Sequence, residues 1–223
     1  MPGRRWGPRR SATLTAITVC LFALAGCSSS GSQYVKSTEN RTYFKVPTGW
    51  KLFDEQQLIQ DNKDLSADQK DKILNSSWRV GFDASPEPQP QHVFAPHSGF
   101  PVGFAEVDHL SGGDSDAVSD ESLRNQFIPV DQLVQNKQLD VLDYQNVNRG
   151  GGFHGIRFRA RVHSAPDSPI YAEGPAFTIE QVSLVNQAHD KSYSLITMCS
   201  AKCFEKNTGR IEGIMDSWTV EES

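Results

Sequence analysis

The sequence predicts an α+β fold: a single domain in which an antiparallel β-sheet is packed by helices. Residues 156–162 alternate apolar and polar side chains, which indicates a strand with one face in the core. Two further apolar segments, 177–185 and 192–198, flank a short polar turn and form a hairpin pattern. Apolar residues at helical spacing in 119–134 and 211–218 add helices without the regular alternation of a parallel β/α fold.

Length and composition agree with this fold class. The 223 residues are 37% hydrophobic and 22% charged, with a formal net charge of −5. This apolar content is sufficient for the core of one domain. The charge balance excludes a wholly disordered acidic chain and a basic nucleic-acid binder, so we expect no nucleic-acid partner.

The N-terminal segment has the organisation of an export signal. Four arginines and no acid lie in residues 1–10, and the apolar stretch 12–25 follows. This stretch is too short to span a bilayer comfortably, and small residues precede a cleavage point, as in secretory signals. Leu24-Ala25-Gly26-Cys27 resembles the lipobox of bacterial lipoproteins. The resemblance implies that residues 1–26 are removed and that the thiol of Cys27 is diacylglycerylated through a thioether, with fatty acids such as palmitate.

Two alternatives to this interpretation stay open. The segment could be an uncleaved anchor that ends in a cysteine by coincidence. The pair Arg9-Arg10 hints at twin-arginine export, but the residues after it lack the usual bulky side chains, so we favour the general secretory route.

Processing would leave an acidic extracytoplasmic chain anchored to the cell membrane. The 197 remaining residues carry 18 basic and 27 acidic side chains, a net charge of −9, because the signal removes four arginines. Residues 27–40 are small and polar and are interpreted as a tether before a domain at 41–223. An acidic domain should stand off from an anionic bilayer.

The cysteines divide by compartment. Cys20 leaves with the signal and Cys27 takes the lipid, which leaves Cys199 and Cys203. Because the compartment is oxidising, this pair predicts a disulfide. Half of a metal site is the rival interpretation, but no second cysteine or histidine pair lies at the required spacing.

The first half of the domain contains strands, a thin helical region and a long loop. Short runs of β-branched and aromatic residues predict strands at 42–47, 78–82 and 102–110. Residues 54–75 have apolar side chains at helical spacing, broken near 61–66. Five prolines in 83–101 predict a long exposed loop, and 111–119 is a polar connection.

The second half begins with a helix capped by Ser119, which Pro129 should kink or divide. Its buried face is expected to comprise Leu123, Phe127, Val130, Leu133 and Val134. Strands follow at 141–147 and 155–163, joined by a glycine-rich turn. A last amphipathic helix carries Ile211, Ile214, Met215 and Trp218, with Asn207-Thr208 as cap candidates.

Two segments resemble the PsbP-like family. They are Phe44-Lys45-Val46-Pro47-Thr48-Gly49-Trp50 near the start and residues 211–220, ending in Ile-Met-Asp-Ser-Trp-Thr-Val. That family includes the photosystem II extrinsic protein and actinobacterial lipoproteins. The resemblance implies an α/β/α sandwich and brings no catalytic residue with it. The proline-rich loop and the Cys199/Cys203 pair are not part of the family pattern.

Motifs for cofactors or nucleophilic catalysis do not emerge. Residues 150–155 match G-x-G-x-x-G, but a strand follows where dinucleotide binding needs a helix N-terminus, so we interpret them as a hairpin turn. No G-x-S-x-G elbow is present. We therefore expect no cofactor.

Two groups of side chains could in principle bind metals, and for both we favour the solvated alternative. Asp114, Asp116, Asp120 and Glu121 lack the spacing of a calcium loop. A second group could converge through the proline-rich loop, and it comprises His92, His97, His109 and Asp108. We expect no resident metal.

The row Arg157, Arg159 and Arg161 is the one constellation with chemical content. It lies on one strand face, with guanidinium groups about 6.8 Å apart at ~3.4 Å rise per residue; His163 continues the row and Arg149 lies nearby. One hypothesis is a site for an anionic partner, such as a carboxylate, a phosphate-bearing polymer or an acidic envelope protein. The other is cross-strand pairing with acids such as Asp143 or Glu180.

Together these observations favour a non-catalytic binding or scaffolding module on the cell surface. One alternative is an envelope hydrolase whose site lies near the proline-rich loop. Another is a structural accessory subunit of a membrane complex.

Overall fold

The computed structural model describes residues 31–60, 65–167, 171 and 173–221. The predicted signal 1–26, Cys20 and Cys27 lie outside the described residues. None of the helices in the described part of the chain is long and apolar enough to cross a membrane.

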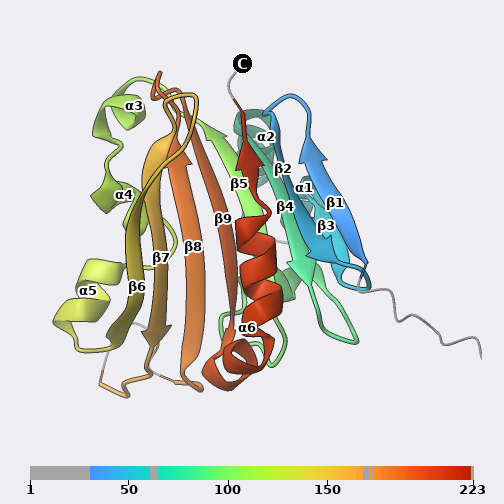
Figure 1. Cartoon of the computed structure of the whole chain (residues 1–223), viewed down its shortest axis with the longest axis vertical. Helices are drawn as coiled ribbons and strands as arrows, with labels where there is room; N and C mark the ends of the chain where they lie inside the picture. Colours follow the sequence, from blue (N-terminus) through green and yellow to red (C-terminus); the bar gives the residue numbers. More distant parts are fainter. Residues whose placement is uncertain (1–30, 61–64, 168–170, 172, 222–223) are drawn as a thin grey trace, which may run out of the picture.

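Two antiparallel sheets form the framework (Figure 1). The larger has seven strands in the order β3-β4-β5-β9-β8-β7-β6, and the smaller has the order β1-β2-β10. The strands of the larger sheet are β3 (Lys51–Asp54), β4 (Ser77–Asp83), β5 (Val102–His109), β6 (Leu139–Asn148), β7 (His154–Val162), β8 (Phe177–Val185) and β9 (Lys191–Ser200). Those of the smaller sheet are β1 (Ser32–Ser37), β2 (Thr42–Pro47) and β10 (Thr219–Val220).

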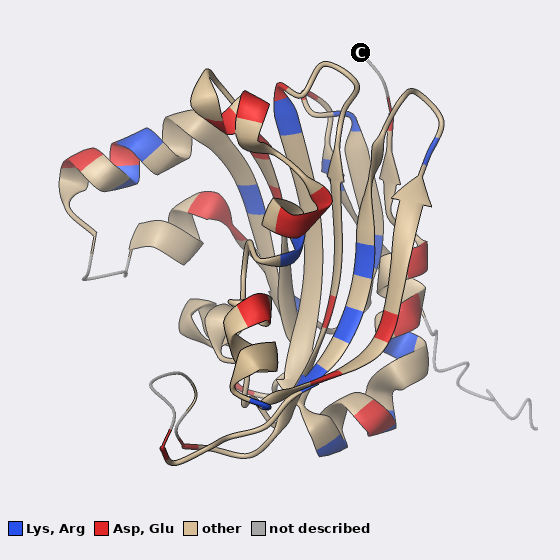
Figure 2. Ribbon diagram, turned by 90° about the vertical axis from the view of Figure 1, so that its left-hand side faces the viewer, with Lys and Arg blue, Asp and Glu red and all other residues tan. Residues whose placement is uncertain are grey.

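Helices cover both faces of the seven-stranded sheet, as Figure 2 shows from the side of β6. One face packs against α6 (Ala201–Asp216) and the smaller sheet. The opposite face packs against the short helices α1 (Glu55–Gln60), α2 (Ala67–Ser76), η1 (Pro90–Phe94), α4 (Asp120–Arg124) and α5 (Val130–Gln135). Helix α3 (Gly113–Ala117) precedes α4. The predicted α+β class, with one domain and helices on both sides of an antiparallel sheet, is confirmed.

Strand β7 has the alternation that the sequence predicts. Ile156, Phe158, Ala160 and Val162 are fully buried against the α4–α5 side. Since successive strand residues point to opposite faces, the arginines between them face the layer of α6. Residues 149–153 turn directly into β7, and no helix follows the glycines, so the hairpin interpretation of the G-x-G-x-x-G match is confirmed.

The two segments that resemble the PsbP-like family are packing motifs. Phe44 and Val46 are fully buried on β2, and Gly49 has a φ of +95° that favours glycine at this turn. At the other end, Trp218 is buried, and its indole Nε1–H donates to Thr42 Oγ1 at 2.8 Å. The beginning and the end of the domain therefore hold each other in place.

Helix boundaries follow the predicted breaks with one correction. Pro129 separates α4 from α5, and Ser119 caps α4 through a hydrogen bond from the backbone N–H of Ser122. However, α6 begins at Ala201, well before the cap candidates Asn207 and Thr208. Both of these side chains donate to the backbone carbonyl four residues earlier, which is how such residues are accommodated inside a helix.

Several local predictions are wrong. The tether prediction fails for residues 32–37, which form β1 and pair with β2 along its whole length. The proline-rich loop contains the 3₁₀ helix η1, and the connection 111–119 contains α3. Val134 is 50% exposed, because the face of α5 that meets the sheet is formed by Val130 and Leu133.

Candidate functional site

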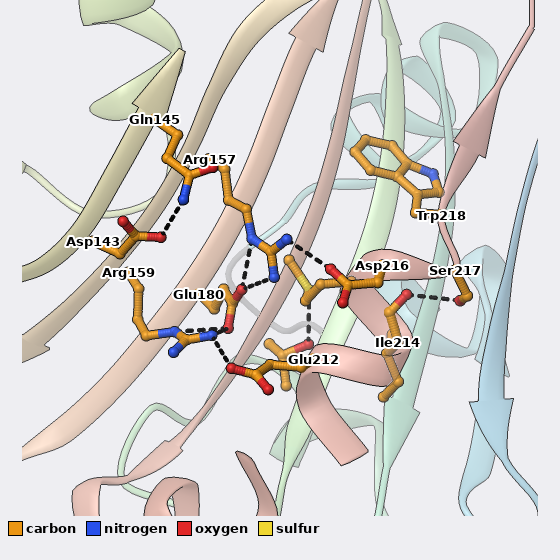
Figure 3. Close-up of polar contacts among 12 residues, drawn as sticks. Asp143, Gln145, Arg157, Arg159, Glu180, Glu212, Ile214, Asp216, Ser217 and Trp218 are labelled. Atoms are coloured by element: carbon orange, nitrogen blue, oxygen red, sulfur yellow. Dashed lines mark hydrogen bonds and ion pairs between the residues drawn. The ribbon is translucent and has the colours of Figure 1, made fainter. Parts of the chain in front are cut away.

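The predicted arginine row lies on β7, and two of its members, Arg157 and Arg159, reach acids of β8 and α6 (Figure 3). Glu180 on β8 sits between two of its members, and its side chain is only 1% exposed. Arg157 donates to Glu180 Oε1 through Nε at 2.9 Å and Nη2 at 2.6 Å. Arg159 donates to Glu180 Oε2 through Nε at 2.9 Å, with Nη2 at 2.7 Å from the same oxygen. One buried carboxylate therefore binds two guanidinium groups.

Helix α6 supplies a second carboxylate to each of these arginines and one to Arg161. Arg157 pairs with Asp216 at 2.7 Å, Arg159 with Glu212 at 3.0 Å, and Arg161 with Glu205 at 2.8 Å. Glu212 and Asp216 are four residues apart on one helix face, a rise of about 6 Å that is close to the ~6.8 Å between alternate residues of β7, and Glu205 lies seven residues before Glu212 on the same face. Figure 2 shows the acidic segments of α6 beside the basic stripe of the sheet.

The pairs determine the electrostatics of the row. Burial alone would lower the pKa of Arg157, but hydrogen bonds from its guanidinium group to Glu180 and Asp216 raise it above the usual value. For Arg159, attraction to Glu180 and hydrogen bonding to Glu212 overcome burial in the same way. The contacts match the pairing hypothesis for Glu180. Asp143, the other predicted partner, accepts a hydrogen bond from Gln145 at 2.9 Å and pairs with no arginine of the described chain.

His163, predicted to continue the row, and Arg149, predicted to lie near it, have other contacts. His163 contacts the carboxylate of Asp140 through Nε2 at 2.6 Å. Arg149 donates to the carbonyl oxygen of Trp218 at 2.7 Å and lies over its ring at 5.5 Å. Burial, together with the positive charge of Arg157, lowers the pKa of Arg149.

A second charged cluster joins β4, β5 and α1 on the opposite face of the sheet. Arg79 pairs with Glu106, which lies directly opposite in register, and its Nη2 is 3.8 Å from Asp108 Oδ1. Burial raises the pKa of Asp108 to about 7, and the neighbouring Glu106 raises it as well. Burial also raises the pKa of Glu55, which accepts a hydrogen bond from the Ser77 hydroxyl at 2.9 Å. An acid with such a pKa can exchange a proton near neutral pH.

This cluster was not predicted as a site. The only sequence signal is that Glu106 and Asp108 are two residues apart and therefore share one strand face, a pattern that is typical of a solvated face. The burial that raises the pKa of Asp108 arises only from the tertiary packing of the folded chain. The cluster also lies at the end of β4 and β5 that is remote from the proline-rich loop, since that loop joins Asp83 to Val102.

In the proline-rich loop, Asp83 organises the chain. Its side chain is fully buried and accepts hydrogen bonds from the backbone N–H groups of Ser85 and Gln89 and from the Ser85 hydroxyl. The His92 ring nitrogen Nδ1 lies 2.9 Å from the same carboxylate. These contacts hold the loop against the sheet, so Asp83 has a structural role.

The metal candidates do not converge. Within the described residues, no group of three or more His, Cys, Asp or Glu side chains is placed to hold a metal ion. His97 instead contacts the carbonyl oxygen of Pro175 at 2.6 Å, and His109 lies exposed at the end of β5. The acidic residues of the candidate calcium site are exposed on α3 and at the start of α4: Asp114, Asp116, Asp120 and Glu121.

The cysteine prediction is supported. Cys199 at the end of β9 and Cys203 in the first turn of α6 form a disulfide, with their Cα atoms 5.9 Å apart. Both residues are buried in the core beneath α6. The bond therefore fixes the point where the last long strand turns into α6, the helix that supplies acids to the arginine row.

Exposed apolar side chains gather along the free edge of the sheet. β6 is an edge strand of the seven-stranded sheet, and Val141, Leu142 and Tyr144 on it are 40–53% exposed. Val134 on the adjacent α5 is equally open. The register shifts between Val141 and Asp143, which indicates a bulge on this edge.

Comparison with known proteins finds similarity only among solved structures. No protein-family model matches the sequence, and no curated protein matches it. Cyanobacterial PsbP (CyanoP) from Synechocystis sp. PCC 6803 is 11% identical, with a TM-score of 0.48, over 90% of this chain and 99% of that chain. The Ran-binding protein Mog1p of Saccharomyces cerevisiae is 12% identical, with a TM-score of 0.42, over 86% of this chain and 96% of that one. Membership in the PsbP-like family therefore stays a prediction.

Proposed function

We propose that the protein is an extracytoplasmic lipoprotein, anchored to the cell membrane through Cys27, whose domain acts as a non-catalytic binding or scaffolding module. The observation that carries the proposal is the sequence Leu24-Ala25-Gly26-Cys27 after a basic and an apolar segment. A diacylglyceryl group on the thiol brings two acyl chains, which attach the protein firmly to the membrane, whereas a single chain gives only marginal attachment.

The disulfide supports export. Disulfides persist in oxidising compartments and are rare in the cytosol of most organisms. The described residues contain only two cysteines, Cys199 and Cys203. Both are buried, and they are bonded to each other. A chain with this pattern is suited to the envelope.

Two observations favour binding over catalysis. The conspicuous charged groups are engaged with one another: Glu180 is enclosed by two arginines, and Glu106 is held by Arg79. In contrast, apolar side chains stand exposed along β6, where Tyr144 and Val141 lie on a free sheet edge. Exposed apolar patches of this kind are characteristic of interaction surfaces.

The Cys27→Ala variant tests the anchor. Wild-type protein should stay with membranes through a high-salt wash and be released by detergent, and its mass should include the acyl groups. Cys27→Ala should be released in soluble, folded form. Cys20→Ala is the matched control, because this cysteine leaves with the signal, and it should fractionate like the wild type. Salt-resistant membrane attachment of Cys27→Ala would overturn the proposal.

A further inference from the structure

A cavity of about 470 Å³ lies between α6 and the smaller sheet. We call it the α6 groove. Its walls are Gly31, Ser32, Lys45, Pro47, Thr48, Trp50, Gly209, Arg210, Gly213 and Ile214. The volume is within the range of small-molecule sites. Gly31 and Ser32, which precede the long pairing of β1 with β2, form one end of the groove wall.

Two glycines open the groove on the side of α6. Gly209 and Gly213 are four residues apart, so they lie on the same face of the helix. A Cβ atom added at either position would meet nothing within 4 Å, and neither residue has a positive φ. Alanine would stabilise the helix at both positions, so no local backbone requirement explains the glycines. Their effect is to expose the helix backbone to the groove.

The charges of the groove are uncompensated. Lys45 and Arg210 line it, and no acidic residue does. Within the described residues neither cation forms an ion pair, and the Lys45 ammonium has only the ring of Tyr34, 5.4 Å away. By contrast, Arg157, Arg159 and Arg161 of the row on β7 each have a carboxylate partner. On an acidic protein, two free cations at one cavity create a local site for an anion.

The remaining wall adds hydrogen-bond donors. Trp50 is 8% exposed, and no described residue accepts a hydrogen bond from its indole N–H. The hydroxyl groups of Ser32 and Thr48 are likewise without a partner among the described residues. A guanidinium and an ammonium group suit the several oxygens of a phosphate, and free hydroxyl and indole donors suit a polyol.

We propose that the α6 groove binds a phosphate ester of a small polyol. The source of that ester depends on the proposed function. If Cys27 carries the lipid, only three residues lie between it and Gly31, a span of at most ~14 Å, so the groove lies close to the bilayer surface. A phospholipid headgroup would then be within reach, and a free polyol phosphate offers the same chemistry.

The first arm of the test measures the binding of sn-glycerol 3-phosphate to the full-length protein by titration calorimetry in neutral detergent. This measurement does not depend on how the chain is anchored. Lys45→Gln/Arg210→Gln should weaken binding at least about tenfold, because charge-assisted hydrogen bonds are lost. Gly213→Leu fills the groove without changing charge and should weaken binding equally. Lys72→Gln, an exposed lysine on α2, is the control and should bind like the wild type.

The second arm distinguishes the sources. Co-sedimentation of the Cys27→Ala protein with phosphatidylglycerol vesicles, but not with phosphatidylcholine vesicles, identifies a lipid headgroup. Binding of glycerol phosphate without vesicle binding identifies a free ester. Thermal melts verify that each variant is folded. Absence of binding to both probes, or undiminished binding by Gly213→Leu, overturns the proposal, whereas a failed membrane anchor leaves the calorimetric result intact.

Discussion

Glu180 is the buried carboxylate that holds Arg157 and Arg159 of β7, and each of these arginines also pairs with an acid of α6. Glu180→Gln replaces a charged acceptor of two guanidinium groups by a neutral amide, which keeps one acceptor oxygen and turns an NH₂ group toward an arginine. The side chain is 1% exposed, so water cannot replace the lost interactions. Arg157 and Arg159 are only 22–23% exposed and would lose the partner nearest to the sheet.

The size of the effect follows from the geometry. Removing one partner of a buried ion pair costs about 3–5 kcal/mol. Here Arg157 keeps Asp216 and Arg159 keeps Glu212, so we expect the lower end, about 3 kcal/mol. With a urea m-value of about 2 kcal/mol/M, that corresponds to a midpoint shift of about 1.5 M.

Equilibrium urea unfolding of the disulfide-intact protein measures this shift. Glu205→Gln is the matched control, because its partner Arg161 lies on the same row but the Glu205 side chain is 64% exposed. Such a pair contributes about 0–1 kcal/mol, so its midpoint should move by less than about 0.5 M. Equal shifts for the two variants, or an unchanged midpoint for Glu180→Gln, would refute the reasoning.

Two further predictions concern other parts of the fold. Because the folded protein holds the Asp108 proton up to a pKa of about 7 and the unfolded chain releases it near 4, this residue lowers stability as pH rises between those values. Asp108→Asn should therefore raise the free energy of unfolding by about 1–2 kcal/mol at pH 8 and hardly at pH 4, as measured by urea titrations at both values. Native protein should contain no free thiol at Cys199 or Cys203, and because their loop is so short, reduction should cost only about 2 kcal/mol in a thermal melt. Titration of two thiols in native protein, or unfolding on reduction at room temperature, would contradict that expectation.

The sequence predicts best those elements whose pattern is local. The alternation in 156–162 and the break at Pro129 are read from neighbouring residues, and both agree with the structure. Strand β1 fails this test, because its only buried apolar side chain is Val35 and its order comes from pairing with β2. The predicted start of α6 was also wrong. Asn207 is a residue type that favours helix caps, but it lies inside the helix and donates to the carbonyl oxygen of Cys203.

Sites assembled from distant segments are beyond a local pattern. The arginine row was visible on one strand, but the carboxylates of Glu212 and Asp216 come from a helix some fifty residues later. The α6 groove combines Lys45 on β2 with Arg210 on α6, and the two are brought together only when the smaller sheet packs against the helix. The buried environment of Asp108 and its proximity to Glu55 of α1 likewise arise only in the folded chain. Charge type and the cross-strand partner Glu180 are thus predictable from the sequence, whereas the partners that α6 supplies are not.

The hypothesis that the arginine row binds an anionic partner can be separated from a structural role by one variant. If Arg157, Arg159 and Arg161 served an external anion, replacing all three by Gln should barely change stability, since exposed pairs contribute about 0–1 kcal/mol each. The contacts with Glu180 predict instead a loss of about 3–5 kcal/mol, because its buried carboxylate would be left without a cation. A thermal melt of the triple variant measures this loss, and a melting temperature close to that of the wild type would restore the row as a candidate anion site. A large drop would leave Lys45 and Arg210 as the cations free to meet a ligand at the α6 groove.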